Sequence, residues 1–457
     1  MQSRNVKGTK DLFGKETRQF QFVENIFSSI AESFGYQEMR PPVLEHSEVF
    51  VRGVGEGSDV VRKEMYTFLD KGERSLTLRP EFTAGIMRLI VQNKLYATET
   101  LPIKAYYNGP VFRYERPQLG RYRQFNQFGV ECVGGTSYFN DLETIMLGYC
   151  MLSTLGLTNV TLKINTLGDE ASREAYKTAL KNYFADKIED MCEDCKDRFN
   201  VNPLRILDCK VPEDQEIVKG APKMSDYLSE ESKERFENIL NALTQMEIPY
   251  EVDDTLVRGL DYYSETVFEF HYTSKKGVNY GAIGAGGHYS NLVKEFGGPE
   301  LEGVGFSFGE ERIVSVLNDD ELLNELNEEG EVEFYICPIC EEAKEAALAL
   351  SVSSRMMGAR VDVNFEGGKL GAMLKKAVKK GALYAIIIGE DELNKNSLQM
   401  KNLVTEEQTE LTVSEYLDAI KQMQEHDHEC HCHDDEDGCE DGECCCHHHH
   451  KDEGDLN

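Results

Sequence analysis

The chain has 457 residues, of which 40% are hydrophobic, enough to fill the cores of two or three domains. Its formal net charge of −33 argues against non-specific binding to DNA or other nucleic acids, because polyanions repel one another at long range. Residues 1–20 are charged throughout, and no stretch reaches the length of a membrane span. We therefore expect a globular, cytoplasmic protein with no membrane contact.

The first predicted elements alternate between helix and strand. Apolar residues recur at helical spacing over residues 17–34. Consecutive prolines remove backbone donors from residues 41–45, so that segment is typical of an edge strand. Residues 66–79 predict a hairpin around a Lys-Gly turn. Residues 80–92 predict a helix with proline in its first turn and Glu81 near its positive end.

The segment 112–131 is the most informative part of the chain. It places four arginines, two carboxylates and several aromatic residues on two extended arms around a turn that contains proline and glycine. Guanidinium groups bind phosphate and aromatic faces stack on bases, so this layout is suited to a nucleoside triphosphate. A salt-bridged surface hairpin would have a similar composition, and the segment by itself leaves both interpretations open.

The remaining elements indicate a divided chain. Charged helices over 170–191 and 229–246 predict an insertion between two halves of one sheet, and strand-rich sequence with a glycine cluster follows from residue 255. After an acidic linker, strands and helices alternate in the manner of a small α/β domain with a largely parallel sheet. The expected linker is 318–333, and the expected domains are 1–325 with an insertion at about 165–250, 331–423, and a disordered tail over 424–457.

Four motifs occur in order along the chain, at 79–83, 112–131, 256–263 and 305–312. Together they resemble the histidyl-tRNA synthetases, a family of class II aminoacyl-tRNA synthetases, and Arg-Gly-Leu-Asp-Tyr-Tyr at 258–263 is the most specific of them. The resemblance implies an α+β catalytic domain with an antiparallel sheet, a helical insertion, and a C-terminal α/β anticodon-binding domain. It further implies a homodimeric histidine–tRNA ligase whose substrates are L-histidine, ATP with Mg²⁺, and histidine tRNA.

The same resemblance assigns catalytic roles to three arginines. Arg113 and Arg258 would hold the α-phosphate of ATP from two sides, and Arg312 would hold the γ-phosphate. This choice agrees with the chemistry, because phosphoryl activation gathers negative oxygens whose charge must be stabilised in the transition state. The further ATP-binding residues implied are Glu115, for the adenine amino group, Phe125, which would stack on the ring, and Arg121.

Recognition of histidine requires partners for both nitrogens of an imidazole. A site that bonds both rejects aliphatic amino acids, because its buried polar groups would otherwise remain unpaired. By resemblance, Glu131 and Tyr263 are that pair. The other histidine-binding residues implied are Glu81, Thr83, Gln127, Arg258, Tyr262 and Tyr289. A tyrosine in such a position could equally serve core packing.

Contacts with tRNA are expected in two places. Arg116 and Gln118 lie in the loop where the family meets the acceptor end, and Gln118 could read the edge of a guanosine. Lys369, Lys375 and Lys376 lie on a predicted helix of the C-terminal domain, where they could bind phosphates. A solvated lysine helix would have the same sequence.

The chain departs from the family pattern at several positions. Residues 286–291 read Gly-Gly-His-Tyr-Ser-Asn, where most relatives have Gly-Gly-Arg-Tyr-Asp-Gly, so His288 and Ser290 replace an Arg-Asp charge pair. Either that pair was structural and is compensated, or substrate affinity is altered. An acid also replaces the usual leucine at Glu310, which we expect to lie at the surface.

Two groups of cysteines point to metal or thiol chemistry. Cys192, Cys195 and Cys209 give three thiols in the insertion, whereas zinc usually takes four ligands, so the set is incomplete in the sequence. Residues 426–450 hold eight histidines and six cysteines with interspersed acids, unlike a purification tag, and predict a tail that binds Zn²⁺ or Ni²⁺. Its predicted ligands are His426, His428, Cys430, His431, Cys432, His433, Cys444, Cys445 and Cys446.

The main alternative function is that of the synthetase-like regulatory subunit of ATP phosphoribosyltransferase, which is catalytically inactive. That paralogue generally lacks the anticodon-binding domain and loses phosphate-binding arginines. Here Arg113, Arg258 and Arg312 and a C-terminal α/β domain are all present. A metal-storage protein built on a former synthetase would likewise have lost these arginines. We therefore expect the ligase.

Overall fold

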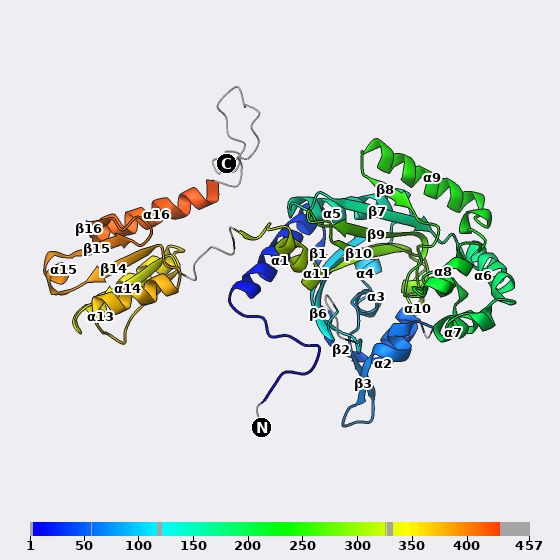
Figure 1. The fold of residues 1–457 in the computed structure, drawn as a ribbon, viewed down its shortest axis with the longest axis horizontal. Coiled ribbons are helices and arrows are strands. Elements are labelled where there is room, and N and C mark those ends of the chain that lie inside the picture. Colours follow the sequence, from blue (N-terminus) through cyan, green and yellow to red (C-terminus); the bar gives the residue numbers. More distant parts are fainter. Residues whose placement is uncertain (1–2, 56, 117–120, 325, 327–331, 430–457) are drawn as a thin grey trace, which may run out of the picture. The chain divides into compact units, whose positions relative to one another are not determined.

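The computed structural model describes residues 3–55, 57–116, 121–324, 326 and 332–429, with residues 424–429 described by their backbone alone. The chain forms two compact units, Met1–Asn327 and Glu328–Asn457 (Figure 1). No helix in the described part of the chain has the length and apolar character that a bilayer crossing requires.

The first unit is built on an eight-stranded sheet in which most neighbouring strands are antiparallel. Only the pairs at the two edges, β1 with β5 and β7 with β8, are parallel. The strands in spatial order are β1 (Gln37–Glu38), β5 (Ile103–Phe112), β6 (Gln124–Val133), β11 (Gly303–Gly309), β10 (Asn279–Tyr289), β9 (Ser264–Thr273), β7 (Val160–Thr166) and β8 (Tyr250–Val252). The predicted class, a largely antiparallel sheet with helices, is confirmed.

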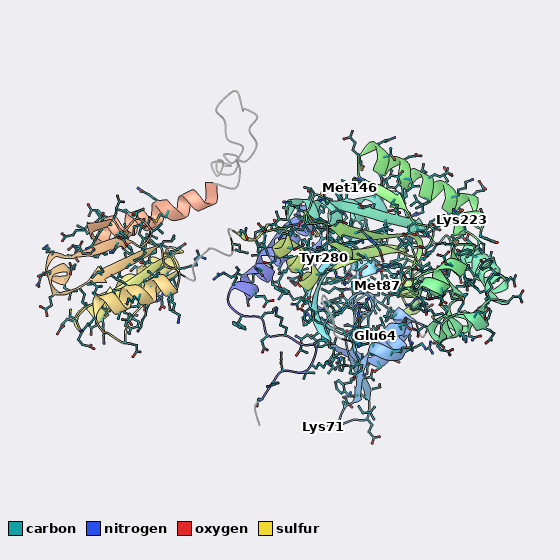
Figure 2. The ribbon with its side chains drawn as sticks, viewed as in Figure 1. Glu64, Lys71, Met87, Met146, Lys223 and Tyr280 are labelled. Carbon is teal, nitrogen blue, oxygen red and sulfur yellow. The ribbon has the colours of Figure 1, made fainter. Side chains whose placement is uncertain are left out.

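Helices cover one face of this sheet. The helices α1 (Lys15–Ser33), α5 (Tyr138–Thr154), α9 (Glu230–Gln245) and α11 (Glu310–Asp319) share a core with alternate strand residues such as Phe128 and Val130. Met146 and Tyr280 pack against this core (Figure 2). Because strand side chains alternate between faces, Gln127 and Glu131 point to the opposite face, where the cavity described below lies.

A small three-stranded sheet and short helices flank that opposite face. The expected hairpin forms from β3 (Tyr66–Leu69) and β4 (Ser75–Leu78), with Lys71 at its turn, and β2 (Leu44–His46) pairs with β4 (Figure 2). The neighbouring helices are α2 (Ser47–Val54), the π-helical turn η1 (Val60–Glu64), α3 (Thr83–Gln92), α4 (Leu95–Thr98) and α10 (Leu292–Glu295). The prediction that a helix begins at Pro80 is wrong, because the Glu81 carboxylate accepts the N–H groups of Thr83 (2.6 Å) and Ala84 (3.0 Å) and so starts α3 at Thr83.

The insertion leaves the sheet after β7 and returns at β8. It contains α6 (Glu170–Phe184), α7 (Glu193–Val201) and α8 (Pro212–Val218), with the 3-10 turns η2 (Ile188–Asp190), η3 (Pro203–Ile206) and η4 (Met224–Asp226). The helix predicted over 170–191 ends at Phe184, because the chain turns to bring Ile188 and Met191 into the same small core. That core also includes Val257 and Tyr263, so the insertion packs directly on the cavity's side of the sheet.

The second unit is a five-stranded sheet in the order β13-β12-β14-β15-β16. The strands β12 (Phe334–Pro338), β13 (Val361–Val363) and β14 (Tyr384–Ile388) are parallel, as expected. The antiparallel hairpin of β15 (Ser397–Asn402) and β16 (Gln408–Thr412) was missed, because both strands are mostly polar and β16 is an exposed edge strand. The helices are α13 (Ala343–Met356), α14 (Leu370–Lys379), α15 (Glu390–Lys395) and α16 (Val413–Glu429).

Two boundaries differ from the expectation. Leu323 is buried in the core of the first unit, so the acidic stretch after residue 318 begins as part of that unit and not as a linker. Helix α16 is held by Tyr416 and Ile420 in the core of the second unit and continues to Glu429. Residues 424–429, predicted to begin the tail, are therefore helical.

Candidate active site

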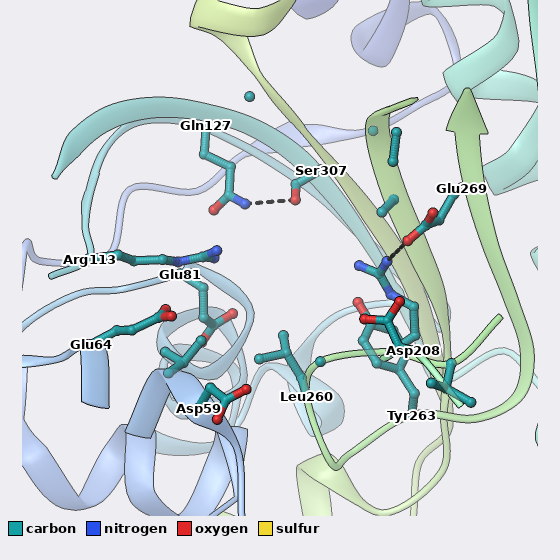
Figure 3. A pocket seen from close by; sticks show the side chains of 18 of the residues that line it. Asp59, Glu64, Glu81, Arg113, Gln127, Asp208, Leu260, Tyr263, Glu269 and Ser307 are labelled. Carbon is teal, nitrogen blue, oxygen red and sulfur yellow. Dashed lines mark hydrogen bonds and ion pairs between the residues drawn. The ribbon is translucent and has the colours of Figure 1, made fainter. Parts of the chain in front are cut away.

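A cavity of about 670 Å³ opens on the face of the eight-stranded sheet opposite α1, α5, α9 and α11. In Figure 3, Glu64 and Arg113 lie on one side of it, and Asp208 and Tyr263 lie on the other. Its lining includes every residue that we expected to bind ATP or histidine: Glu81, Thr83, Arg113, Glu115, Arg121, Phe125, Gln127, Glu131, Arg258, Tyr262, Tyr263, Tyr289 and Arg312. These residues come from distant parts of the chain, and the sheet register brings them together.

A buried carboxylate, that of Glu131, lies in the lining of the cavity and is only 2% exposed. It accepts hydrogen bonds from the Thr83 hydroxyl (2.6 Å), Tyr289 (2.8 Å) and Tyr107 (3.2 Å). Burial raises the pKa of Glu131 to about 8, and these three donors only partly oppose the rise. A Cβ on Gly305 would lie 2.1 Å from the Glu131 carboxylate, so only glycine fits there.

Tyrosine rings form the wall beside Glu131. The rings of Tyr262 and Tyr289 meet edge to face with centroids 5.8 Å apart, and the hydroxyls of Tyr262 and Tyr263 are 3.5 Å apart. Burial raises the pKa of Tyr262 and of Tyr289 well above the usual value, so both hydroxyls remain neutral donors. Tyr107 belongs to this group and was missed, because its strand reads as ordinary core sequence.

Arg258 lies beside these tyrosines and forms an ion pair with Glu269. Its Nη1 lies 2.8 Å from Glu269 Oε1, the ion pair that is dashed at Glu269 in Figure 3. The other carboxylate oxygen of Glu269 lies 2.8 Å from His271 Nε2. Burial by itself raises the pKa of Glu269, but the His271 contact and the Arg258 charge outweigh it and hold that pKa below its usual value. Glu269 therefore stays ionised and orients Arg258. Glu269 was missed, although an acid between two phenylalanines of a strand was an available signal.

Positive charge collects at the other end of the cavity. The Arg113 Nε donates to the backbone carbonyl of Pro80 (2.9 Å), and Arg312 donates to the carbonyl of Ala282. Within the described residues, neither guanidinium forms an ion pair. Burial, followed by the nearby charge of Arg121, lowers the pKa of Arg312. An anion entering this end would therefore meet two guanidinium groups that are not already held in an ion pair within the described residues.

The adenine-side candidates lie close to these arginines. The Arg113 guanidinium is 5.3 Å from the Phe125 ring centroid, and Arg121 lies 3.5 Å from the Glu115 carboxylate. Gln127 donates to the Ser307 hydroxyl at 2.7 Å (Figure 3). This bond holds the Gln127 amide in one orientation at the floor of the cavity.

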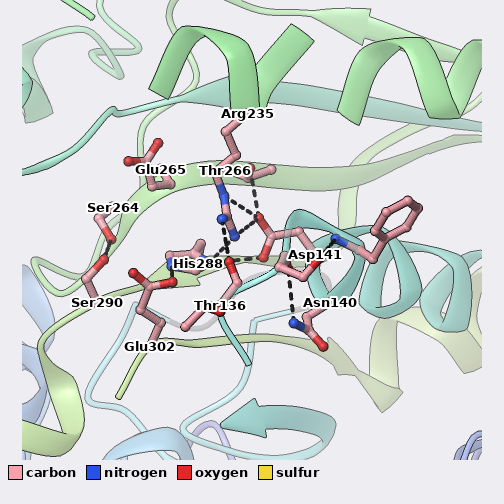
Figure 4. Close-up of polar contacts among 12 residues, drawn as sticks. Thr136, Asn140, Asp141, Arg235, Ser264, Glu265, Thr266, His288, Ser290 and Glu302 are labelled. Atoms are coloured by element: carbon pink, nitrogen blue, oxygen red, sulfur yellow. Dashed lines mark hydrogen bonds and ion pairs between the residues drawn. The ribbon is translucent and has the colours of Figure 1, made fainter. Parts of the chain in front are cut away.

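The residues that replace the family's Arg-Asp pair lie behind the cavity and not in its lining. His288 is 1% exposed, and its Nδ1 is 3.0 Å from Asp141, which also pairs with Arg235 at 2.9 Å (Figure 4). Glu302 lies 3.5 Å from the second ring nitrogen. Burial lowers the pKa of His288, but Asp141 and Glu302 outweigh that effect and raise it to about 9. The charged His288 thus restores a buried ion pair, which supports the structural explanation of this departure.

Ser290 and Glu310 are two further positions that depart from the family pattern. Ser290 forms a hydrogen bond with Ser264 at 2.8 Å (Figure 4). The expectation that Glu310 lies at the surface is wrong, because its side chain is 0% exposed on the inner face of α11. Burial, with Glu24 and Glu311 nearby, raises the pKa of Glu310 well above the usual value.

The residues expected to contact tRNA or metal in the tail are placed only in part. Arg116 is exposed beside the cavity loop, and Gln118 lies outside the described residues. Lys369, Lys375 and Lys376 are exposed at the start and on the outer face of α14. His426 and His428 belong to α16 by backbone alone, and the remaining predicted ligands of the tail, from Cys430 onward, lie outside the described residues.

Comparisons with known proteins agree with this geometry. The model of the histidyl-tRNA synthetase family matches residues 8–313, and the model of the anticodon binding domain matches residues 333–423. The chain is 43% identical over 409 residues to the histidine–tRNA ligase of Geobacillus thermodenitrificans, with 90% of this chain and 96% of that protein covered. It is 42% identical over 421 residues to that of Bacillus subtilis, with 92% and 98% covered.

A solved structure gives the same result for the fold. The apo histidyl-tRNA synthetase of S. aureus superposes with a TM-score of 0.78 at 32% identity, covering 92% of this chain and 100% of that one. A family model spanning most of the first unit, close relatives along nearly the whole chain and a matching fold agree with one another. The chain belongs to the histidyl-tRNA synthetase family.

Proposed function

We propose that the protein is a histidine–tRNA ligase, which activates L-histidine with ATP to histidyl-adenylate and transfers it to the 3′ end of histidine tRNA. One observation carries the proposal. A single cavity joins a buried carboxylate, Glu131, to a cluster of arginines that includes Arg113 and Arg312. The end of the cavity with Glu131 suits an imidazole, and the end with the arginines suits a polyphosphate.

Histidine binds at the Glu131 end. The Glu131 carboxylate accepts the N–H of one imidazole nitrogen, and the Tyr263 hydroxyl serves the other nitrogen. Tyr262 and Tyr289 enclose the ring, and Glu81, Thr83 and Gln127 serve the amino acid's α-amino and carboxylate groups. Glu81 already caps α3 through both carboxylate oxygens, so its contribution is the negative charge that it holds beside an ammonium group.

ATP binds at the arginine end as its Mg²⁺ complex, in which the ion offsets charge on the outer phosphates. A histidine carboxylate oxygen attacks the α-phosphorus, and the bond from that phosphorus to pyrophosphate breaks. Arg113 and Arg258 stabilise the charge that develops on the α-phosphate, and Arg312 holds the γ-phosphate. Glu115, Arg121 and Phe125 hold the adenosine, with Phe125 stacked on the base.

The larger organisation follows the same function. We infer a catalytic domain over 1–325 with its insertion at about 165–250, an anticodon-binding domain over 331–423 and a metal-binding tail from residue 424. Arg116 and Gln118 meet the acceptor end of the tRNA, and the exposed lysines of α14, Lys369, Lys375 and Lys376, meet anticodon-arm phosphates. The active form is a cytoplasmic homodimer.

The regulatory-subunit alternative predicts a different cavity. A protein that only binds a partner has no use for guanidinium groups arranged around a phosphate site, yet Arg113, Arg258 and Arg312 all line this cavity. The match to an anticodon binding domain over 333–423 also favours the ligase.

Histidine-dependent exchange of labelled pyrophosphate into ATP tests the proposal, because it measures adenylate formation without tRNA. We expect exchange with histidine and background exchange with leucine or glutamine, followed by charging of histidine tRNA when it is added. A protein that binds histidine but catalyses no exchange would be the regulatory type. Exchange without charging would place the fault in the tRNA contacts alone.

A further inference from the structure

Three cysteines and one aspartate converge in the insertion; none of them is among the residues assigned above to ATP or histidine, although Cys192 and Cys209 line the same cavity. Cys192 precedes α7 and Cys195 lies in its first turn, whereas Cys209 and Asp214 lie just before and within the first turn of α8. Their sulfur and carboxylate atoms all lie within 4.8 Å of one another. The fourth ligand that the sequence motif lacked is therefore supplied by a residue that no cysteine spacing would indicate.

The spacing fits a tetrahedral ion. Zinc–sulfur bonds are about 2.3 Å long, so two sulfurs on one tetrahedral zinc are separated by about 3.8 Å. The Cys192 and Cys209 sulfurs are 3.8 Å apart. Asp214 is held in place because it accepts the backbone N–H of Cys192 at 3.2 and 3.3 Å, and its Oδ2 lies 3.1 Å from the Cys209 sulfur.

A second observation separates this cluster from a set of packed thiols. Asp214 is 1% exposed, and within the described residues it forms no ion pair with a lysine, arginine or histidine. A buried carboxylate without a cation is costly, and three neighbouring thiols supply no positive charge. A divalent ion at the centre of the cluster would compensate it.

We propose that Cys192, Cys195, Cys209 and Asp214 bind a structural Zn²⁺. Thiolate ligands select zinc over the hard ions Mg²⁺ and Ca²⁺, and four protein ligands leave no open position for catalysis. Three of the four ligands, Cys195, Cys209 and Asp214, are buried, as in structural zinc sites, and Cys192 is partly exposed on the side of the cavity. This proposal is independent of the proposed ligase activity.

The segment between Cys195 and Cys209 lines one side of the active-site cavity. Between the ligands, Arg205 donates to Asp59 at 2.8 Å and to the carbonyl of Gly259 at 3.3 Å, and Asn202 donates to Asp261 at 2.8 Å. Gly259 and Asp261 lie in the same loop as Arg258 and follow it directly in the sequence. The zinc therefore fixes the segment that holds this loop, and its removal should loosen the cavity wall.

The test compares the full-length protein with full-length Cys195→Ser and with the matched control Cys150→Ser, whose thiol lies on α5 outside the cluster. All three proteins have the same C-terminal tail, so any metal that the tail binds contributes equally to each measurement. Zinc content by mass spectrometry should fall by about one ion per chain in Cys195→Ser alone. Equal content in all three proteins would overturn the proposal.

Alkylation of the parent protein provides a readout that does not depend on a variant that folds. Peptide mapping after iodoacetamide treatment reports Cys192 separately from the tail cysteines. Chelation should raise the Cys192 alkylation rate by about tenfold or more, because a bound thiolate is shielded, and should leave Cys150 unchanged. Cys192 that reacts at the same rate with and without chelator would refute the site. Zinc content and alkylation rate can both be interpreted whether or not the protein charges tRNA, so the zinc site is tested separately from the ligase activity.

Discussion

Histidine binding should depend on the ionisation of Glu131, and Glu131→Gln should remove that dependence. Burial raises the pKa of this carboxyl to about 8 in the free site. The imidazole N–H needs an ionised acceptor, so histidine binds the deprotonated form. Because the folded pKa is raised, the competent form is scarce at neutral pH and increases as the pH rises through about 8.

The size of the effect follows from that pKa. With a pKa of about 8, roughly a tenth of the sites are ionised at pH 7 and roughly three quarters at pH 8.5. The kcat/KM for histidine should therefore rise about eightfold between these values, equivalent to about 1.2 kcal/mol. Histidine's own imidazole is already mostly neutral across this range, so it contributes little to the rise.

The assay is pyrophosphate exchange at saturating ATP, with histidine varied from pH 7 to pH 8.5. Glu131→Gln should have a lower kcat/KM that is nearly flat over this range, whereas its KM for ATP should change little. Glu310→Gln is the matched control, because it removes another buried carboxyl with a raised pKa that does not line the cavity. A flat profile in the parent, or an eightfold rise that survives in Glu131→Gln, would refute the assignment.

Three further outcomes are expected. Arg258→Ala should slow pyrophosphate exchange by about 100-fold or more, equivalent to about 3–4 kcal/mol, with cooperative urea unfolding retained; exchange within about threefold of the parent would remove Arg258 from the mechanism. Glu310→Leu should raise the free energy of unfolding by about 1–3 kcal/mol at pH 8. In the unfolded chain the Glu310 carboxyl ionises once the pH exceeds its usual pKa, whereas in the folded chain it keeps its proton, so the parent protein loses stability as the pH rises. An equal gain in the free energy of unfolding for Glu310→Leu at pH 4 would contradict this explanation. Deleting residues 426–457 should remove more than one bound Zn²⁺ or Ni²⁺ per chain, measured by mass spectrometry, and leave charging in metal-free buffer nearly unchanged; loss of charging would show that the tail takes part in the reaction.

Local pattern and motif were sufficient for much of this protein. Periodicity predicted α1, the hairpin of β3 and β4, and the alternation of strand and helix from β12 to β14, because each depends on residues close together in the chain. The motif at 258–263 was enough to predict the family. Polar strands such as β15 and β16 carry no comparable signal, because neither strand has a run of alternating apolar residues and β16 is an exposed edge strand.

The tertiary structure decided which residues from distant parts of the chain lie next to one another. The register that pairs Gly305 with Glu131 on one side and with Gly287 on the other places three strands around one carboxylate, and no local pattern encodes a register between distant strands. Burial changed the chemistry of residues that the sequence had named: Glu131 acquired a raised pKa, and Glu310 proved to be inside. Asp214 joined three cysteines because the fold brings the starts of α7 and α8 together. The sequence by itself determined which residues could act, and packing determined their neighbours, their charge and their exposure to water.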